Sequence, residues 1–313
     1  MPVYKREMKK GNEFAAGMAL ACLAALLWSG NYIVARGLNQ KITPVTLAFF
    51  RWLTATVVLA PIAYRQVKAH WGDIKQHLGY LTITALSGVT LFNTFIYVAG
   101  RYSSATNLAI IGTSAAPIFV LLLAALFLKE KPTRLQLLGT VVCVAGILLL
   151  ISGGNLQQLQ QLRLSLGDVW ILGAAMAFAI YTLLVRRKPK ALPPLAFLFA
   201  LFFIGTLLLL PAFAIDSLNG LTFQWDATIG GVFLYLGVGA SVGAFLCWNL
   251  AIHKLGSART ALFSNLIPVF STIEAVLILG ENSSPVVVLS MLLILSGLLL
   301  ANLQLLKSMR AKR

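Results

Sequence analysis

The chain has 313 residues, of which 59% are hydrophobic and only 11% are charged, a composition that excludes a soluble globular domain. The formal net charge of +16 would suit a nucleic-acid binder, but the positions of the basic residues along the chain favour a membrane protein instead. The three cysteines, Cys22, Cys143 and Cys247, lie inside apolar runs without metal-ligand spacing, so they indicate buried thiols and no disulfide framework.

Apolar runs of about 18 to 24 residues recur along the chain, and each is long enough to cross a hydrocarbon core of about 30 Å. The first run follows Lys9 and Lys10 and continues past twenty residues without a small-residue cleavage site, so it indicates a membrane span and not a signal peptide. Ten spans are expected, joined by short connections. They cover residues 15–36, 44–64, 78–98, 104–128, 134–151, 167–185, 193–214, 228–251, 258–279 and 285–305.

The lysine and arginine positions predict the orientation, because cytoplasmic loops carry an excess of both residue types. With the N-terminus inside, twenty of them fall in cytoplasmic segments and four in external ones, while Arg51 lies within a span. Both termini are therefore predicted to be cytoplasmic. The same asymmetry accounts for the net charge through topology and attraction to anionic lipid, without a nucleic-acid partner.

One stretch of the chain occurs twice, at 104–146 and again at 257–297. In each copy a proline, Pro117 or Pro268, precedes a glutamate by thirteen residues, and a glycine follows that glutamate by sixteen. Further matches keep an offset of 150 to 151 residues, which predicts two homologous halves. The matched pairs are Gly17 with Gly167, Trp28 with Phe178, Arg36 with Arg186, Pro44 with Pro194, Pro61 with Pro211 and Gly88 with Gly239.

Each half contains five expected spans, an odd number, so the second half must enter the membrane in the opposite sense to the first. Inverted repeats are typical of secondary transporters that work by alternating access, although channels and membrane enzymes can be duplicated too. The expected fold class is an all-α polytopic membrane protein with ten transmembrane helices in two inverted five-helix repeats. Its expected parts are a first repeat at 1–151, an external linker at 152–166 and a second repeat with a cytoplasmic tail at 167–313.

Several motifs are shared with a known family. They are Leu26-Leu27-Trp28-Ser29-Gly30-Asn31, Phe50-Arg51-Trp52, the segment 99–105, Leu128-Lys129-Glu130-Lys131, Trp248-Asn249 and Leu255-Gly256-Ser257-Ala258-Arg259. On these motifs the chain resembles an EamA-type member of the drug/metabolite transporter superfamily over nearly all of its length. The resemblance implies that spans 1–4 and 6–9 surround a central cavity, with spans 5 and 10 outside as scaffold. It leaves the substrate open among amino acids, drugs, sugars and nucleotide sugars, and bacterial relatives include exporters of amino acids, aromatic ones among them.

Two ionisable residues lie well inside expected spans, Arg51 in the second and Glu274 in the ninth, where a charge is costly unless it faces a cavity or a partner. Their repeat partners are Leu201 and Leu123, so the shared scaffold demands neither charge. The two residues are candidates for an ion pair or for one outer vestibule, and Glu274 is a candidate proton carrier. The alternatives are that Glu274 reaches the wet interface and that Arg51 stabilises a helix interface.

Uncharged polar and aromatic side chains inside the spans are candidates to line the substrate cavity, because asparagine offers a donor and an acceptor and aromatic rings offer flat walls. The alternative role is hydrogen bonding between helices. Pro117 and Pro268 are hinge candidates, since a proline removes a helical hydrogen bond and kinks its helix. The cavity candidates are Trp28, Asn31, Tyr32, Asn93, Tyr97, Asn107, Tyr181, Trp248, Asn249 and Asn265.

The sequence contains no recognisable catalytic, metal-binding or ATP-binding motif, so it predicts neither an enzyme nor a cofactor. We expect a secondary-active transporter of the bacterial inner membrane, an exporter of small metabolites such as amino acids. Its expected partners are a small-molecule substrate and the lipid bilayer. Proton exchange through Glu274 is the coupling hypothesis, with facilitated diffusion as the rival. A drug or quaternary-amine exporter is the alternative among transporters, and a flippase for lipid-linked substrates is the alternative from another class.

Overall fold

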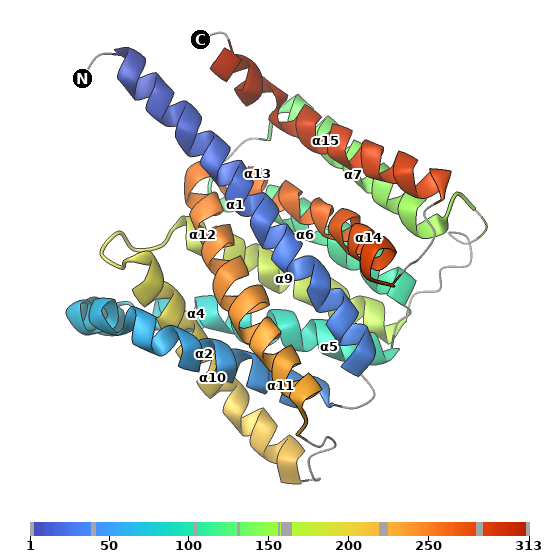
Figure 1. The fold of residues 1–313 in the computed structure, drawn as a ribbon. Helices are drawn as coiled ribbons and strands as arrows, with labels where there is room; N and C mark the ends of the chain where they lie inside the picture. Colours follow the sequence, from blue (N-terminus) through green and yellow to red (C-terminus); the bar gives the residue numbers. More distant parts are fainter. Residues whose placement is uncertain are drawn as a thin grey trace.

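The computed structural model of the chain describes residues 3–38, 42–102, 105–129, 132–155, 157, 165–218, 225–279 and 284–310, and within them it contains helices and no strand. The all-α fold class is thereby confirmed. Figure 1 shows helices of both halves crossing one another, with the start of α1 and the end of α15 near the same end of the molecule. The helices are α1 Val3–Leu38, α2 Pro44–Ala69, α3 Trp71–Gln76, α4 Leu78–Ala85, η1 Leu86–Leu91, α5 Phe92–Tyr102, α6 Ala105–Phe127, α7 Arg134–Ser152, α9 Leu166–Arg186, α10 Pro194–Leu218, α11 Ala227–Leu234, η2 Tyr235–Gly243, α12 Ala244–Leu255, α13 Ser257–Leu262, η3 Phe263–Asn265, α14 Leu266–Leu279 and α15 Pro285–Arg310.

Polar residues at the span edges determine where several helices begin. Before α2, the Thr43 side chain accepts a hydrogen bond from the Thr46 backbone N–H, and a proline occupies the first helical position. Thr133 and Gln136 form a reciprocal capping box at the start of α7. Asp226 caps α11 by accepting from a backbone N–H one turn on. These helices therefore start within a residue of the spans expected from the sequence.

Seven helical stretches are long and apolar enough to cross a membrane, and two shorter apolar helices accompany them within the described residues. The expected total of ten spans stays a prediction. The seven stretches are Glu13–Gly30, Pro44–Ala69, Leu78–Tyr102, Leu166–Arg186, Pro194–Leu218, Ala227–Leu255 and Pro285–Leu303, and the shorter helices are Ala115–Phe127 and Arg134–Leu150.

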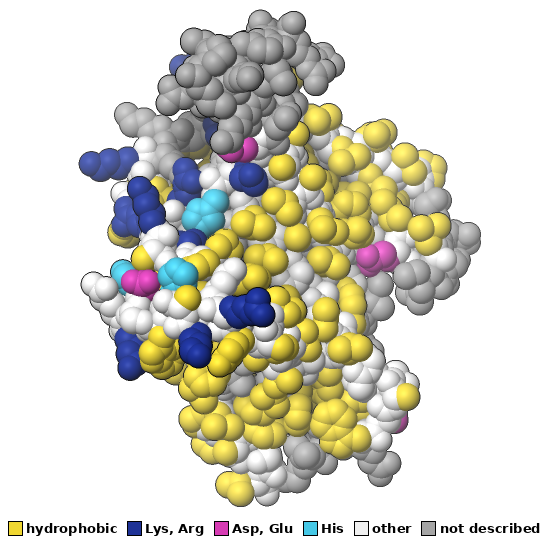
Figure 2. All heavy atoms as spheres, turned by 60° about the vertical axis from the view of Figure 1, so that its left-hand side comes forward, with side chains coloured by type: hydrophobic (Ala, Val, Ile, Leu, Met, Phe, Trp, Pro, Cys, Tyr) yellow, Lys and Arg dark blue, Asp and Glu magenta, His cyan; other side chains and the backbone are white. Residues whose placement is uncertain are grey.

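The outer surface matches a bilayer environment. Large apolar side chains stand exposed on it, for example Leu126 at 72% and Val141 at 65% exposure, which in water would form a large apolar patch. Figure 2 shows hydrophobic side chains over most of one face, with lysines and arginines gathered on one side of it. A hydrophobic belt bounded by basic groups is the pattern of a protein that spans a membrane.

Two helical rods change to π-helix in their middle, where each backbone hydrogen bond spans one residue more than in an α-helix. The η1 segment joins α4 to α5, and the η2 segment joins α11 to α12. Gly88 lies in η1 and its repeat partner Gly239 lies in η2, so the change occurs at corresponding places in the two halves. Such segments disturb the regular helical ladder, and carbonyl groups there become available to side chains.

The two halves pack through each other. The α9 helix lies against α5 and α6 of the first half, and α1 lies against α12 and α14 of the second. The α2 and α10 helices also meet, with the hydroxyl oxygens of the repeat partners Thr56 and Thr206 3.1 Å apart. The α7 and α15 helices form a separate pair at the edge of the molecule (Figure 1), where Gly139 and Gly297 allow backbone-to-backbone contact.

Candidate substrate cavity

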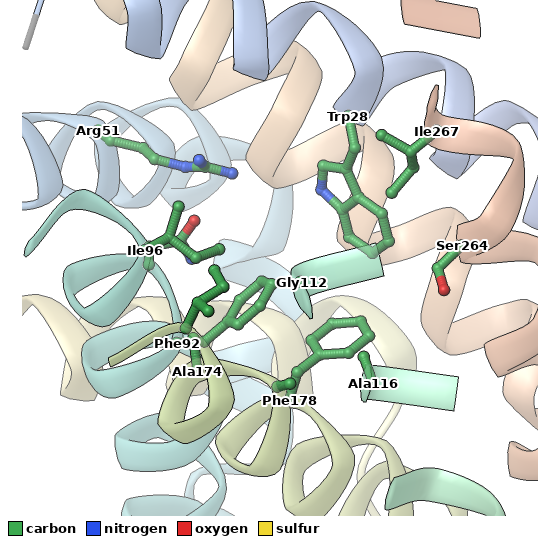
Figure 3. Close-up of a pocket in the computed structure, with 13 residues that line it drawn as sticks. Trp28, Arg51, Phe92, Ile96, Gly112, Ala116, Ala174, Phe178, Ser264 and Ile267 are labelled. Atoms are coloured by element: carbon green, nitrogen blue, oxygen red, sulfur yellow. The ribbon is translucent and has the colours of Figure 1, made fainter. Parts of the chain in front are cut away.

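A cavity of about 50 Å³ lies between helices of both halves, and its lining comes from α1, α2, α5, α6, α9, η3 and α14. The edge helices α7 and α15 contribute none of these residues. Figure 3 shows the side chains converging on this space. A cavity of this size holds a few water molecules, so a metabolite requires the helices to separate. The lining residues are Trp28, Arg51, Phe92, Asn93, Ile96, Gly112, Ala116, Ile171, Ala174, Ala175, Phe178, Ser264 and Ile267.

Arg51 projects from α2 into the wall of the cavity and is only 1% exposed. Its Nε donates to Ser241 Oγ at 2.8 Å, and its Nη2 donates to the Ala240 carbonyl at 2.9 Å. Both acceptors belong to the π-helical segment η2. Its Nη1 donates to the Tyr97 hydroxyl at 3.1 Å. Because the guanidinium is always ionised, these bonds join α2, α5 and η2 and hold a positive charge beside the cavity.

Aromatic side chains form one side of the cavity. The Trp28 indole N–H donates to the Ala240 carbonyl at 2.9 Å, the same carbonyl that Arg51 contacts. Trp28 and its repeat partner Phe178 meet edge to face with ring centroids 5.7 Å apart, and Phe92 lies 4.6 Å from Phe178. The two halves thus contribute facing aromatic rings to the cavity, as the labelled side chains in Figure 3 show.

Asn93 supplies a polar group to this largely apolar wall. It lies on α5, is 1% exposed and lines the cavity, and its Nδ2 has no hydrogen-bond partner within the described structure. A buried amide donor without a partner is unfavourable by about 1 to 3 kcal/mol. A water or a substrate oxygen in the cavity would satisfy it.

Glu274 lies on α14 outside the lining of this cavity. Its Oε1 lies 2.6 Å from Ser29 Oγ, while its Oε2 is shielded from solvent and lacks a partner among the described residues. Neither oxygen pairs with Arg51 in the described structure, so the two charges form no ion pair there. Both charges lie near enough to the Tyr235 hydroxyl to act on it electrostatically.

Other residues singled out from the sequence lie near the cavity but not in its lining. Tyr181 donates to Asn249 Oδ1 at 2.6 Å and joins α9 to α12. Trp248 packs behind Trp28 with a centroid distance of 5.0 Å. Asn265 lies beside the thiol of a cysteine on α7. The side chains of Asn31, Tyr32 and Asn107 lie outside the described part of the structure.

The two repeat-equivalent prolines have different surroundings. Pro117 lies inside the continuous helix α6. Pro268 lies in the first turn of α14, directly after the 3₁₀ turn η3. Because proline has no backbone N–H, the carbonyl four residues earlier lacks its α-helical donor, and η3 occupies that place. A 3₁₀ turn just before the proline is therefore found in the second half alone among the described residues.

Several residues in and around the cavity were missed by sequence reasoning. Phe92 and Phe178 line the cavity, yet a phenylalanine in an apolar span carries no signal of its own. The pairing of Phe178 with Trp28 in the repeat was the available clue. Ser29 and Ser241 hold the two charged side chains, but single serines in spans are common helix-interface residues. Within the described residues, no group of three potential metal ligands occurs.

Membrane-crossing helices arranged as two intertwined repeats, with polar groups buried in a cavity between them, define a multi-pass membrane protein. The model of the EamA-like transporter family matches the chain twice, at residues 15–152 and 165–303, and the chain belongs to this family. Its membership indicates a transporter and not an enzyme.

Relatives of similar length carry transporter names. An uncharacterized transporter of Archaeoglobus fulgidus is 30% identical over 84% of this chain and 89% of its own length. The uncharacterized transporter YyaM of Bacillus subtilis is 26% identical over 83% of this chain and 85% of its own. A protein of Streptantibioticus cattleyicolor named "probable terminal-alkyne amino-acid exporter" is 24% identical over 82% of this chain and 83% of its own. A crystal structure 16% identical in sequence shares the fold, with a TM-score of 0.73 over 94% of this chain and 97% of that one.

Proposed function

We propose that this protein is a secondary-active exporter of small metabolites such as amino acids, and that it works by alternating access through the cavity between its two halves. One observation carries the proposal. The buried Asn93 amide, whose Nδ2 lacks a partner in the described structure, and the Arg51 guanidinium share one cavity wall with aromatic rings. Polar and charged side chains inside membrane spans are costly unless they face a cavity or a partner.

The substrate proposal follows from the chemistry of the wall. Arg51 and the Nδ2 of Asn93 are donors, so they suit a carboxylate or another oxygen-rich group. Trp28, Phe92 and Phe178 suit an apolar or aromatic body. The described residues of the lining include no carboxylate, and its arginine repels a cation, which disfavours the quaternary-amine alternative. A neutral amino acid with an apolar side chain combines the favoured features.

Alternating access needs a seal that can open at each face. At the basic end of the molecule, Arg187 donates to the Phe127 carbonyl at the end of α6, and Arg186 donates to the His253 carbonyl near the end of α12 at 3.3 Å. In the same loop, burial lowers the pKa of the Lys188 amine below its ordinary value. We assign this loop to the cytoplasmic gate, because basic residues favour that side of a bacterial inner membrane. Contacts between cations and helix carbonyls are reversible.

The prolines fit the same cycle. Pro117 in α6 and Pro268 in α14 lie on the two repeat-equivalent helices that border the cavity at Ala116 and Ile267. We assign them as flex points, since a helix bends more readily where a hydrogen bond is missing.

Counterflow in proteoliposomes tests this function. Liposomes preloaded with unlabelled neutral amino acid should accumulate the labelled compound when they contain the wild-type protein. Asn93→Ala should reduce counterflow by about tenfold, because one hydrogen bond to a charged substrate group is worth about 1.5 kcal/mol. Asn302→Ala is the matched control, since Asn302 is equally buried but lies on α15, away from the cavity.

The outcomes separate the classes of function. Equal activity of Asn93→Ala and Asn302→Ala would show that the substrate does not bind at the Asn93 wall of the cavity. Movement of labelled lipid, without exchange of any amino acid, would establish the flippase alternative. Exchange of quaternary amines in preference to amino acids would establish the drug-exporter alternative.

A further inference from the structure

The hydrogen bonds around Ser29 on α1 fit two protonation states of one carboxyl group. Ser29 is fully buried, and its Oγ lies 2.6 Å from Glu274 Oε1 and also 2.6 Å from the Leu26 carbonyl oxygen. A hydroxyl has a single proton, so it can donate to only one of these acceptors at a time. The second short contact then needs a proton from elsewhere.

Protonation of Glu274 satisfies both contacts at once. When the carboxyl is ionised, the Ser29 hydroxyl donates to it. When the carboxyl is protonated, its O–H donates to Ser29 Oγ, and the Ser29 hydroxyl turns to donate to the Leu26 carbonyl. The two states use the same atoms at the same separations, so the change requires only rotation of a hydroxyl.

One carboxyl oxygen of Glu274 lacks a hydrogen-bond partner in the described structure. Its Oε2 is shielded from solvent and lacks a partner in the described structure, which is unfavourable for an ionised carboxylate. Described side chains on α6, η3 and α15, which pack on α14, include no charged or titratable group near it. On α1 the described titratable groups are Cys22 and Glu13, about two and four turns from Ser29.

The Tyr235 hydroxyl lies on another helix, within electrostatic range of this carboxyl. The charge of Glu274 acts electrostatically on the Tyr235 hydroxyl on η2, and so does the charge of Arg51. Tyr235 donates to the Leu27 carbonyl at 2.8 Å, so its own proton is already committed to α1.

The repeat-related positions, which also lie between the two halves, are apolar. The repeat partner of Glu274 is Leu123 and that of Ser29 is Ala179, and these two residues belong to one hydrophobic cluster between α6 and α9. The fold therefore packs at this place without an acid and a hydroxyl. The acid and the hydroxyl come from different halves and occur together at only one of the two repeat-related contacts, where placing them inside the membrane is costly, so a structural role explains them poorly.

We propose that Glu274 is a proton-binding site separate from the solute cavity, and that Ser29 transmits its protonation state to α1. Trp28, which directly precedes Ser29, lines the cavity and donates to the Ala240 carbonyl that Arg51 also contacts. A change in the bonds at Leu26 and Ser29 therefore acts one residue from the cavity wall. The proton site rests on the proposed transport function for its purpose, although proton binding itself can be measured without a substrate.

Infrared difference spectroscopy of the purified protein in lipid tests proton binding directly. The wild type should show a carboxylic C=O band that appears on acidification and shifts in heavy water. Glu274→Gln should lack this band, whereas Glu274→Asp should retain it at a shifted frequency. Ser29→Ala should shift it too, because the protonated carboxyl loses its acceptor. Glu13→Gln removes an exposed carboxyl and should leave the band unchanged.

Each result decides the proposal. A wild-type band that persists unchanged in Glu274→Gln would overturn it, as would a band insensitive to Ser29→Ala. Retention of a shifted band in Glu274→Asp shows that loss in Glu274→Gln reflects chemistry and not misfolding. If the bands behave as expected while no solute is exchanged in liposomes, the proton site stands and the proposed substrate fails.

Discussion

At the scale of single residues, the polar groups of this protein are concentrated where the two halves differ. Arg51 corresponds to Leu201, and Glu274 corresponds to Leu123. The Arg51 guanidinium is held by a serine, a tyrosine and a backbone carbonyl from two other helices. These neutral groups hold its positive charge beside the cavity.

Replacing Arg51 tests how far these neutral partners depend on it. Arg51→Leu introduces the residue that the repeat-equivalent helix already carries, so the backbone should accept it. The carbonyl of Ala240 and the hydroxyls of Ser241 and Tyr97 would lose a charged donor inside the protein. We expect a loss of about 3 kcal/mol in the free energy of unfolding, because buried acceptors left without donors are costly. Thermal unfolding in detergent measures it.

A second arginine on the same helix provides the control. Arg65 lies near the exposed end of α2, so Arg65→Leu should change the free energy of unfolding by less than about 0.5 kcal/mol. Equal stability of Arg51→Leu and wild type would show that the guanidinium does not contribute to the free energy of unfolding.

The sequence indicated the cavity residues only where polarity stood out. Trp28, Arg51 and Asn93 could be singled out because each is unusual inside an apolar span, and all three border one space. Phe92 could not, because nothing distinguishes it from the other aromatic residues of the spans. Asn265 was chosen over Ser264, yet Ser264 lines the cavity, since neighbouring residues on a helix point in directions about 100° apart.

At the scale of elements, the ends of the helices were largely predictable and their interiors were not. Proline, threonine and aspartate caps mark the starts of α2, α7 and α11. The π-helical segments η1 and η2 left no trace in the sequence, because periodicity is unreadable where every face of a span is apolar. Yet η2 supplies the carbonyl and the hydroxyl that bind Arg51.

Close packing against η1 gives a test at this scale. A Cβ atom on Gly88 would lie 2.1 Å from a ring carbon of Tyr181, and that ring is tied to Asn249 by a hydrogen bond of 2.6 Å. Gly88→Ala should therefore lower the free energy of unfolding by about 1 to 3 kcal/mol through overpacking. Gly79→Ala is the matched control on the adjoining helix α4, where a Cβ meets nothing within 4 Å.

The two substitutions should act in opposite directions. Alanine is a better helix former than glycine by about 1 kcal/mol, so Gly79→Ala should be neutral or stabilising. Thermal unfolding of both variants in the same detergent provides the comparison. Similar midpoints for the two variants would mean that the Tyr181 ring can move aside freely.

At the scale of the whole molecule, the duplicated helices form a shared scaffold, and the charged side chains of Arg51 and Glu274 occur at positions where the two repeats differ. Symmetric positions meet across the halves, as Thr56 and Thr206 do, and the π segments recur at corresponding places. The acid Glu274, the hydroxyl of Ser29 and the guanidinium of Arg51 each occur at only one of two repeat-equivalent positions. In the proposed alternating-access cycle, the similar packing of the two halves would let the cavity open to either face, and the proposed proton site would be needed only once.

Repeat-equivalent surface positions test whether the two halves are inverted. Gln76 ends α3 and Ala227 begins α11, both are exposed, and their offset of 151 residues places them at the same point of each repeat. Inversion puts them on opposite sides of the membrane, and Figure 1 shows the end of α2, next to α3, at the other end of the molecule from α11. In a background with Cys22, Cys143 and Cys247 replaced, Ala227→Cys should react with a membrane-impermeant maleimide in intact cells, and Gln76→Cys only in inside-out vesicles. Labelling of both from the same side would establish parallel repeats and exclude the inverted cycle proposed for this cavity.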